Sequence, residues 1–256
     1  MEIGSSIYYL TLLLGGLLAG IINTLSGYGS IITLSLLMDV VGLPANVANG
    51  SNRIGVMAAG TFASIGFYKE GKLNLKKSKL YVFITFIGAV CGVYCATIIS
   101  NEGFRAIFKY LSVVMLFIIL IKPKRWLRTE SSAQRLPLYI LWPAFLLAGF
   151  YGGFIQMGLG LILLSIMVLL CKIELIEANG IKALIIVVFT IMAIAIFQWK
   201  GLMDWKAGSI IAIGQGVGAY FTSTYISRIP GAQLWAYRLL VIIVVSVVIY
   251  QFYIGW

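Results

Sequence analysis

Long apolar stretches separated by short polar breaks run through the whole chain. Each half of the sequence holds four apolar segments, and most are close to the roughly 20 residues that a helix needs to cross a bilayer. They cover residues 7–41, 45–69, 80–100 and 103–121 in the first half, and 138–171, 175–199, 206–227 and 233–254 in the second. The pattern predicts an all-α integral membrane protein that crosses the membrane several times.

The first apolar segment of each half is too long for a single crossing. About 35 residues at 1.5 Å each would form a helix of roughly 52 Å, against about 30 Å of hydrocarbon. Small or polar residues interrupt both segments, at 23–30 in the first half and at 149–160 in the second. We therefore expect each half to be a broken helical hairpin followed by three transmembrane helices.

Three patches of the first half recur in the second half at a nearly constant offset. The paired ranges are 20–29 with 149–158, 48–53 with 177–182, and 67–76 with 197–206. Such an offset indicates an internal repeat, and glycine-interrupted segments at matching positions are typical of secondary transporters. The predicted units are a first transmembrane repeat at 1–121, a basic linker at 122–137 and a second transmembrane repeat at 138–256.

Composition and charge strengthen the membrane interpretation. Hydrophobic residues make up 61% and charged residues 11% of the chain, against roughly 45–50% and 25% in soluble domains. The formal charge of +11 does not indicate a nucleic-acid partner, because the basic residues gather in two short loops between apolar segments. We expect both loops to be cytoplasmic; contact with anionic lipid is the other interpretation of the same clusters. The loops contain Lys69, Lys72, Lys76, Lys77 and Lys79, and Lys122, Lys124, Arg125, Arg128 and Arg135.

The relative orientation of the two halves follows from counting crossings. If each broken segment enters and leaves the membrane on one side, each half crosses an odd number of times, and the repeats are inverted with respect to one another. If each broken segment crosses once, the repeats are parallel. We favour inversion, which puts both termini on the outer face.

Several kinds of chemistry are excluded by what the sequence lacks. The chain has no histidine, and its cysteines (Cys91, Cys95 and Cys171) stand in or beside apolar runs without a C-x-x-C pattern. A histidine-based metal site, triad or proton relay is therefore excluded, and we expect neither a metal nor a cofactor. Without a G-x-S-x-G elbow or a pair of Asp residues in adjacent segments, we expect that the protein is not an enzyme.

Two basic residues stand inside apolar segments at repeat-related positions. Arg53 lies about eight residues beyond Pro44, and Lys182 holds the corresponding place in the second half. A cation within the membrane costs at least about 2.5–3.5 kcal/mol and is a functional hypothesis by default. The pair could form a pseudo-symmetric anion site. Alternatively each reaches the interface or pairs locally, Lys182 with Glu177.

The glycine-rich breaks supply the second ingredient of an anion site. We expect a helix to restart after Gly27-Tyr28-Gly29, at about Ser30, and another after Gly158-Leu159-Gly160. Each new helix would point its free backbone N–H groups at the break. Neutral donors from the same region complete the predicted binding set, namely Asn23, Ser26, Ser30, Asn52 and Gln156. Asp39 and Glu177 are the acidic side chains placed to couple proton movement, although both could merely cap or pair.

These motifs resemble those of the TauE/SafE family of sulfite and sulfonate exporters over essentially the whole chain. The first-half family motifs are represented by Gly20–Thr33 and Gly50–Arg53, and the second-half motifs by Gly149–Gly160 and Glu177–Lys182. The resemblance implies a small sulfur oxyanion or organosulfonate as the cargo. The chain departs from the family at Asn23 and Gly152, where Asp is common, and at Gln156 and Leu159, where small residues are expected.

The sequence thus predicts a multi-pass transporter of a small anion in a bacterial-type cytoplasmic membrane, working by alternating access. Sulfite, sulfoacetate or a similar compound is the expected substrate. The alternative from another class is a membrane assembly or lipid-binding protein whose embedded bases hold a headgroup. The anion, the direction of transport, the coupling ion and homo-oligomerisation stay open.

Overall fold

The computed structural model describes residues 2–121, 137–225 and 229–253, and every regular element within them is a helix. The predicted all-helical fold is confirmed, while the basic linker, except for Pro137, lies outside the described residues. The first half contains α1 (Glu2–Ser26), α2 (Gly29–Ser35), the π-helical turn η1 (Leu36–Val40), α3 (Ala45–Lys69), α4 (Leu75–Ile98) and α5 (Asn101–Ile121). The second half contains α6 (Leu138–Phe154), α7 (Leu159–Ser165), the π-helical turn η3 (Ile166–Leu170), α8 (Leu175–Trp199), α9 (Trp205–Thr224) and α10 (Ala232–Tyr253).

Both long apolar segments are interrupted, as predicted. The first break, residues 27–28, separates α1 from α2, and the second break, residues 155–158, separates α6 from α7. Gly27 (φ +82°) and Gly158 (φ +70°) have the left-handed backbone conformation that ends helices and that glycine adopts without a steric penalty. The broken hairpins follow directly from these glycines.

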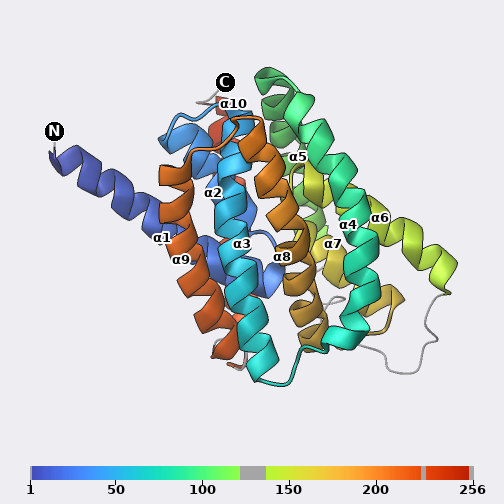
Figure 1. Ribbon diagram of the computed structural model, residues 1–256. Helices are drawn as coiled ribbons and strands as arrows, with labels where there is room; N and C mark the ends of the chain where they lie inside the picture. The colour runs from blue at the N-terminus through green and yellow to red at the C-terminus, as the bar shows by residue number, and fades with distance from the viewer. Residues whose placement is uncertain (1, 122–136, 226–228, 254–256) are drawn as a thin grey trace.

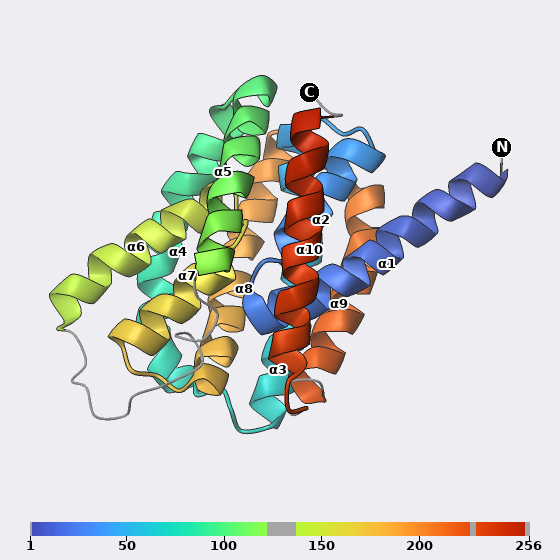
Figure 2. The same cartoon turned by 180° about the vertical axis from the view of Figure 1, so that it is seen from behind.

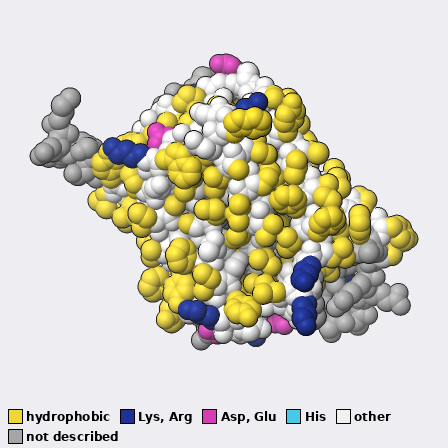
Figure 3. Space-filling model, viewed as in Figure 1, with side chains coloured by type: hydrophobic (Ala, Val, Ile, Leu, Met, Phe, Trp, Pro, Cys, Tyr) yellow, Lys and Arg dark blue, Asp and Glu magenta, His cyan; other side chains and the backbone are white. Residues whose placement is uncertain are grey.

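The surface is that of a multi-pass membrane protein. Within the part of the chain that the structure describes, four helical stretches are long and apolar enough to cross a bilayer, and shorter apolar helices accompany them. The four stretches are Tyr8–Ser26, Ser78–Ile98, Asn101–Leu120 and Leu175–Trp199. Large side chains such as Phe83, Tyr94 and Phe117 are exposed. Figure 3 shows hydrophobic side chains spread over one face, with the charged side chains towards its edges.

The two central helices, α3 and α8, run in opposite directions (Figures 1 and 2). The start of α3 lies beside the α8–α9 connection, because a Cβ built on Gly50 would be 2.0 Å from the Leu202 carbonyl oxygen. The start of α8 lies beside the α3–α4 loop, because a Cβ built on Gly180 would be 3.1 Å from the Lys72 carbonyl oxygen. The neighbours α4 and α9 likewise run in opposite directions (Figure 1).

Each broken hairpin packs its first helix against a helix of the other half. Glycines four residues apart allow the backbones to touch, in α4 against α6 and in α9 against α1, as is typical of small-residue pairs in membrane helices. The distances from a built Cβ to the facing carbonyl oxygen are 2.0 Å for Gly88 and Leu146, 1.9 Å for Gly92 and Phe150, 2.2 Å for Gly214 and Leu13, and 2.3 Å for Gly218 and Leu17. Any larger side chain would force these helices apart.

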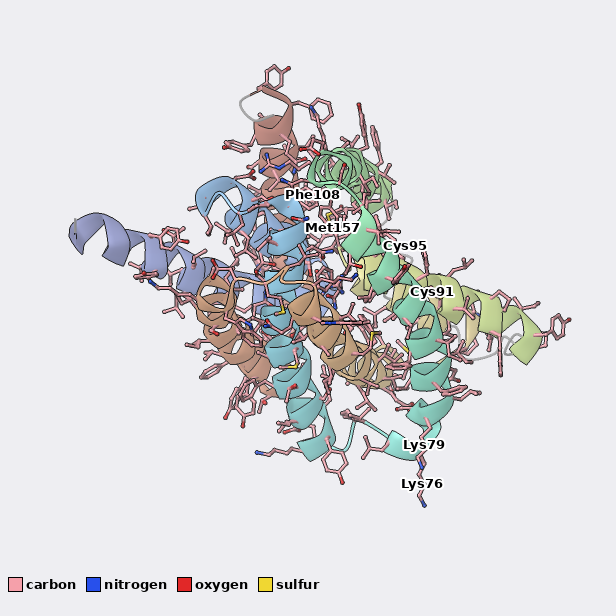
Figure 4. The ribbon with its side chains drawn as sticks, turned by 45° about the horizontal axis from the view of Figure 1, so that its top comes forward. Lys76, Lys79, Cys91, Cys95, Phe108 and Met157 are labelled. Carbon is pink, nitrogen blue, oxygen red and sulfur yellow. The ribbon has the colours of Figure 1, made fainter. Side chains whose placement is uncertain are left out.

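Helix α4 illustrates how polar and apolar positions are distributed on an outer helix. Lys76 and Lys79 lie near its first turn, and Cys91 and Cys95 lie higher on the same helix (Figure 4). Cys91 is exposed, Cys95 is half-buried, and neither is in a disulfide. This arrangement agrees with a helix whose first turn meets the polar edge and whose body meets lipid.

Candidate functional site

Arg53 is fully buried in α3 and donates hydrogen bonds to the end of α6. Its Nη1 lies 2.7 Å from the Gly152 carbonyl oxygen and 2.8 Å from Gln156 Oε1. Its Nη2 lies 2.7 Å from the Gly153 carbonyl oxygen and 3.2 Å from Asn49 Oδ1. We call this arrangement the Arg53 cap, because the last carbonyls of α6 have no partner within their own helix.

Lys182 is buried in α8 and makes the corresponding contacts at the end of α1. Its Nζ lies 3.2 Å from the Asn23 carbonyl oxygen, 3.1 Å from the Thr24 carbonyl oxygen and 2.8 Å from Asn179 Oδ1. Three hydrogen bonds use the three N–H donors of an ammonium group. We call this arrangement the Lys182 cap; Lys182 therefore reaches the other half rather than the interface.

The two caps cross between the halves of the chain. A base from the first half holds the broken helix of the second half, and a base from the second half holds the broken helix of the first half. A cation at a helix C-terminus is also favoured by the helix dipole. All the oxygens that accept from Arg53 and Lys182 in these contacts are neutral carbonyl or amide oxygens, so no carboxylate among these contacts balances the charge of a protonated base.

An asparagine one turn before each base completes each cap, and sequence reasoning did not select these residues. Asn49 accepts from Arg53 and donates from Nδ2 to the Phe154 carbonyl oxygen at 2.9 Å. Asn179 accepts from Lys182 at 2.8 Å and donates to the Leu175 carbonyl oxygen at 3.0 Å. The signal was present, because both asparagines fall in the repeated patches.

The two breaks meet each other inside the molecule. A Cβ built on Gly27 would be 2.3 Å from the Cα of Gly160, and one built on Gly160 would be 2.3 Å from the Cα of Gly27. Gly29 fits similarly against the Ala19 carbonyl oxygen, at 2.2 Å from a built Cβ. A helix restarts at each break, at Gly29 and at Leu159, which is one and two residues before the predicted restarts after Gly29 and Gly160. These glycines therefore allow close backbone contact at the centre.

Several buried N–H donors around the breaks have no hydrogen-bond partner. They are Asn52 Nδ2, the Arg53 Nε and Gln156 Nε2. The Arg53 guanidinium has hydrogen-bond donors but no acceptor, so Gln156 turns its Oε1 towards Arg53. The Nε2 of Gln156 is then left without a hydrogen-bond partner. Gln156 also has a left-handed φ of +62°, a strained conformation of the kind that gathers at functional sites.

The same region contains buried groups that the sequence pattern did not single out. Thr33 donates to Asn52 Oδ1 at 2.6 Å, which leaves the Asn52 amide nitrogen as the free end. The Tyr28 hydroxyl is buried without a partner. Tyr151 donates to the Met157 carbonyl oxygen, and Met157 lies close to α5 (Figure 4), where Ser112 Oγ is 3.8 Å from its sulfur.

The other predicted site residues take lesser places. Ser26 donates to the Ile22 carbonyl oxygen within its own helix at 2.9 Å, and Ser30 is buried in α2. Asp39 lies in η1 and interacts electrostatically with Arg105 of α5. Glu177 lies in the first turn of α8. The structure therefore brings together the bases, the break glycines and the amides, while the two carboxylates lie near helix ends.

The groups at the centre are of the kinds that can attract an anion. When protonated, two buried bases with neutral partners carry positive charge in a medium of low dielectric, where opposite charge is strongly attracted. Unpaired N–H donors lie next to one of them. Within the described residues, no group of three or more His, Cys, Asp or Glu could hold a metal ion.

Comparison with known proteins gives the chain its family. The sequence pattern of the sulfite exporter TauE/SafE family matches residues 12–252. The probable membrane transporter protein ORF9 of Sinorhizobium sp is 26% identical over 87% of this chain and 84% of its own length. The probable membrane transporter protein YfcA of Escherichia coli K12 is 28% identical over 86% and 83%. A probable membrane transporter protein of Haemophilus influenzae is 27% identical over 80% and 79%.

No solved structure is significantly similar to the chain, so the family assignment depends on sequence alone. The family match covers nearly all the described helices, both breaks and both caps. The relatives match over most of their own length and share the description of membrane transporters. The chain therefore belongs to the sulfite exporter TauE/SafE family and is a multi-pass membrane transporter of the cell membrane.

Proposed function

We propose that this protein is a secondary transporter of a small anion, with a sulfur oxyanion or organosulfonate such as sulfite or sulfoacetate as its substrate. It is a carrier rather than an enzyme, and it works by alternating access. The observation that carries the proposal is the pair of buried cationic caps, Arg53 and Lys182, at the inner ends of two broken helices. The anion binds beside the point where the two breaks meet, within reach of the positive charge of the caps.

The electrostatics favour an anion over a neutral or cationic substrate. A buried cation without a counter-ion is costly, and a bound anion near both caps offsets that cost. The Nη atoms of Arg53 and the Nζ of Lys182 already donate hydrogen bonds to carbonyl and amide oxygens. They therefore act mainly through charge, while the free donors of Asn52 and Gln156, with Arg53 Nε, make the direct hydrogen bonds.

The element order supports two inverted repeats as the moving parts. Each half has a broken hairpin, a π-helical turn and three further helices. The opposite directions of α3 and α8 agree with an inverted pair (Figures 1 and 2). Because each broken hairpin is held by a base of the other half, tilting one half against the other would move the two breaks and their anion together. Such a motion exposes a central site alternately to each side.

The sulfur oxyanion is suggested by the family description, which is that of a sulfite exporter. It also suits the site, because neutral N–H groups and nearby fixed charge complement an oxyanion that must lose much of its hydration to cross. A sulfonate presents three oxygens, so several amide donors can contact it at once.

The test is uptake into proteoliposomes of the purified protein, comparing sulfite, sulfoacetate, taurine and thiosulfate. We expect transport of at least one anion of this panel, with strong loss in the Arg53→Ala/Lys182→Ala double variant. The matched control is Lys109→Ala, which removes a cation of α5 that packs on the Phe252 ring, 4.1 Å from its centre. Transport that is equal in the double variant and the wild type would contradict the proposed site.

The inverted arrangement has its own test. Helix α10 ends on the side of the molecule opposite the α3–α4 loop (Figures 1 and 2). If that basic loop is cytoplasmic, the C-terminus lies outside the cytoplasm. A reporter that functions only outside the cytoplasm should then be active when it is fused after Trp256. A reporter that is instead found in the cytoplasm would contradict the proposed topology. Binding of anionic lipid without any transport would instead support the alternative of a lipid-binding membrane protein.

A further inference from the structure

Gln215 of α9 is a buried glutamine that the predicted site does not include. Its side chain is 1% exposed, and its Nε2 has no hydrogen-bond partner. An unpaired amide in the interior costs about 1–3 kcal/mol, so a residue retained at such a place needs a reason. We propose that Gln215 is a substrate-binding residue that donates to the transported oxyanion; this inference depends on the proposed function.

Gln215 lies where α9 meets both the broken helix α1 and the base-bearing helix α3. Its backbone touches α1, because a Cβ built on Gly20 would be 2.3 Å from the Gln215 carbonyl oxygen. Its amide lies against α3, because a Cβ built on Gly55 would be 2.9 Å from Gln215 Nε2. The absence of a side chain at Gly55 leaves room for this amide to reach the face of α3.

The same face of α3 carries Asn52, one turn before Gly55. Side chains three residues apart on a helix have Cβ atoms about 5–6 Å apart, so the two amides lie within reach of one small ligand. Asn52 Oδ1 is occupied by the Thr33 hydroxyl at 2.6 Å, and Asn52 Nδ2 is free. Asn52 and Gln215 therefore offer two unpaired amide nitrogens from two helices.

Packing does not require a glutamine at this position. The contacts of the two halves place Gln215 opposite Thr85 of α4, because a Cβ built on Gly20 would be 2.3 Å from the Gln215 carbonyl oxygen and one built on Gly149, 129 positions later, would be 2.1 Å from the Thr85 carbonyl oxygen. The Thr85 hydroxyl donates to the Tyr81 carbonyl oxygen of its own helix at 2.7 Å. A shorter side chain with a satisfied polar group thus serves the equivalent contact, and the unpaired amide of Gln215 is an addition on one side only.

The chemistry of the pair fits an oxyanion. Amide donors add hydrogen bonds without adding charge, and together with the positive caps they favour a ligand with two or more oxygens over a spherical halide. The amide oxygen can also accept a hydrogen bond from a hydroxyl or ammonium group of an organosulfonate. We therefore assign Gln215 to the recognition of the oxyanion group or its immediate neighbour.

The test compares Gln215→Leu with Gln251→Leu. Gln251 of α10 is also 1% exposed, and neither of its amide atoms has a partner. Both substitutions replace a buried unpaired amide by an apolar side chain of similar size, which is expected to be neutral or stabilising in the absence of ligand. We expect oxyanion affinity, measured by calorimetry with the best anion of the transport panel, to fall about tenfold in Gln215→Leu alone.

The outcomes separate the two proposals. If the wild type binds an anion and Gln215→Leu binds it equally well, Gln215 is not a ligand, although the proposed function stands. If the wild type binds and transports no anion of the panel, both proposals fail. Should Gln215→Leu fold poorly, Gln215→Met tests the same loss of the amide with a more flexible side chain. An equal loss of affinity in Gln251→Leu would also contradict the inference, because the effect would then not be local.

Discussion

The two caps each hold the end of a broken helix, but they use different bases, and only the Arg53 cap leaves N–H donors unpaired. Lys182 Nζ donates hydrogen bonds to two backbone carbonyl oxygens and to Asn179 Oδ1. Arg53 also holds two adjacent carbonyls but keeps Nε free, and it orients Gln156, whose amide nitrogen is free as well. The Arg53 cap therefore has N–H donors without partners, whereas Lys182 itself has no donor left and can act on a ligand through its charge alone.

The two breaks differ in the same sense. Gly27 and Gln156 are 129 positions apart, the offset of the repeat, and both have left-handed backbones with φ of +82° and +62°. Glycine takes this conformation freely, whereas a residue with a Cβ pays roughly 1–2 kcal/mol. The first break is thus built for close contact with Gly160, and the second accepts strain in order to place an amide beside Arg53.

The largest expected effect is that of Arg53→Ala. It removes the donors to Gly152 and Gly153, leaves those buried carbonyls unpaired and deletes one of the two central charges. We expect anion affinity to fall tenfold or more, as for the loss of a hydrogen bond to a charged group, together with a lower melting temperature. Arg53→Lys should recover part of both, because an ammonium keeps the charge but not the planar fork. Calorimetry and thermal unfolding in detergent measure the two effects.

Lys182→Ala should have a smaller effect than Arg53→Ala. It removes three hydrogen bonds and a charge, but no free donor lies on Lys182. We expect a loss of melting temperature with a severalfold weaker anion affinity, arising from charge alone. Lys182→Arg is the matched control, since it retains the charge. A greater loss of affinity in Lys182→Ala than in Arg53→Ala would reverse the comparison between the two caps.

The sequence predicted the helices and breaks closely, because long apolar runs and glycines are local signals. The segments 45–69 and 175–199 have the bounds of α3 and α8. It also singled out Arg53 and Lys182, because charge inside an apolar run is conspicuous, and their role in binding stays a prediction. The cross-half partners were not predictable from local pattern. Arg53 contacts Gly152, 99 positions away, through a backbone carbonyl that leaves no mark in the residue type.

Gln215 shows a further limit of sequence reasoning. A single glutamine in an apolar helix looks like an ordinary polar residue, and only its burial without a partner at Nε2 distinguishes it. The direct binding role of the break residues and the repeat inversion both stay predictions. They depend on a ligand and on motion rather than on the pattern of side chains.

Gln156→Gly should separate strain from binding. Glycine relieves the strain of the left-handed backbone, which stabilises the protein. It also removes the hydrogen bond from Arg53 and the free amide nitrogen, and the loss of the hydrogen bond opposes that gain in stability. We expect a melting temperature close to that of the wild type, since strain and hydrogen bond are each worth about 1–2 kcal/mol, and a severalfold weaker anion affinity. Gln156→Ala keeps the strain and loses the amide, so it should be the less stable of the two. Unchanged affinity in both variants would exclude Gln156 as a ligand.

The smallest expected effect concerns proton coupling. Glu177 lies in the first turn of α8 and Asp39 in η1 beside Arg105, and neither accepts a hydrogen bond from Lys182 or Arg53 among the contacts that form the caps. A charge near a helix end typically contributes about 0.3–1 kcal/mol, which corresponds to a change in rate of only a few-fold. We therefore expect Glu177→Gln to alter pH-dependent transport modestly, and Asp39→Asn to alter it less. Transport rates measured across a pH series in proteoliposomes check this. If Glu177→Gln leaves the pH dependence of transport untouched, proton coupling through the carboxylate at that position is ruled out. If Glu177→Gln abolishes the pH dependence, the proton travels on the Lys182 side, and the two caps then serve different ligands, the coupling ion and the substrate.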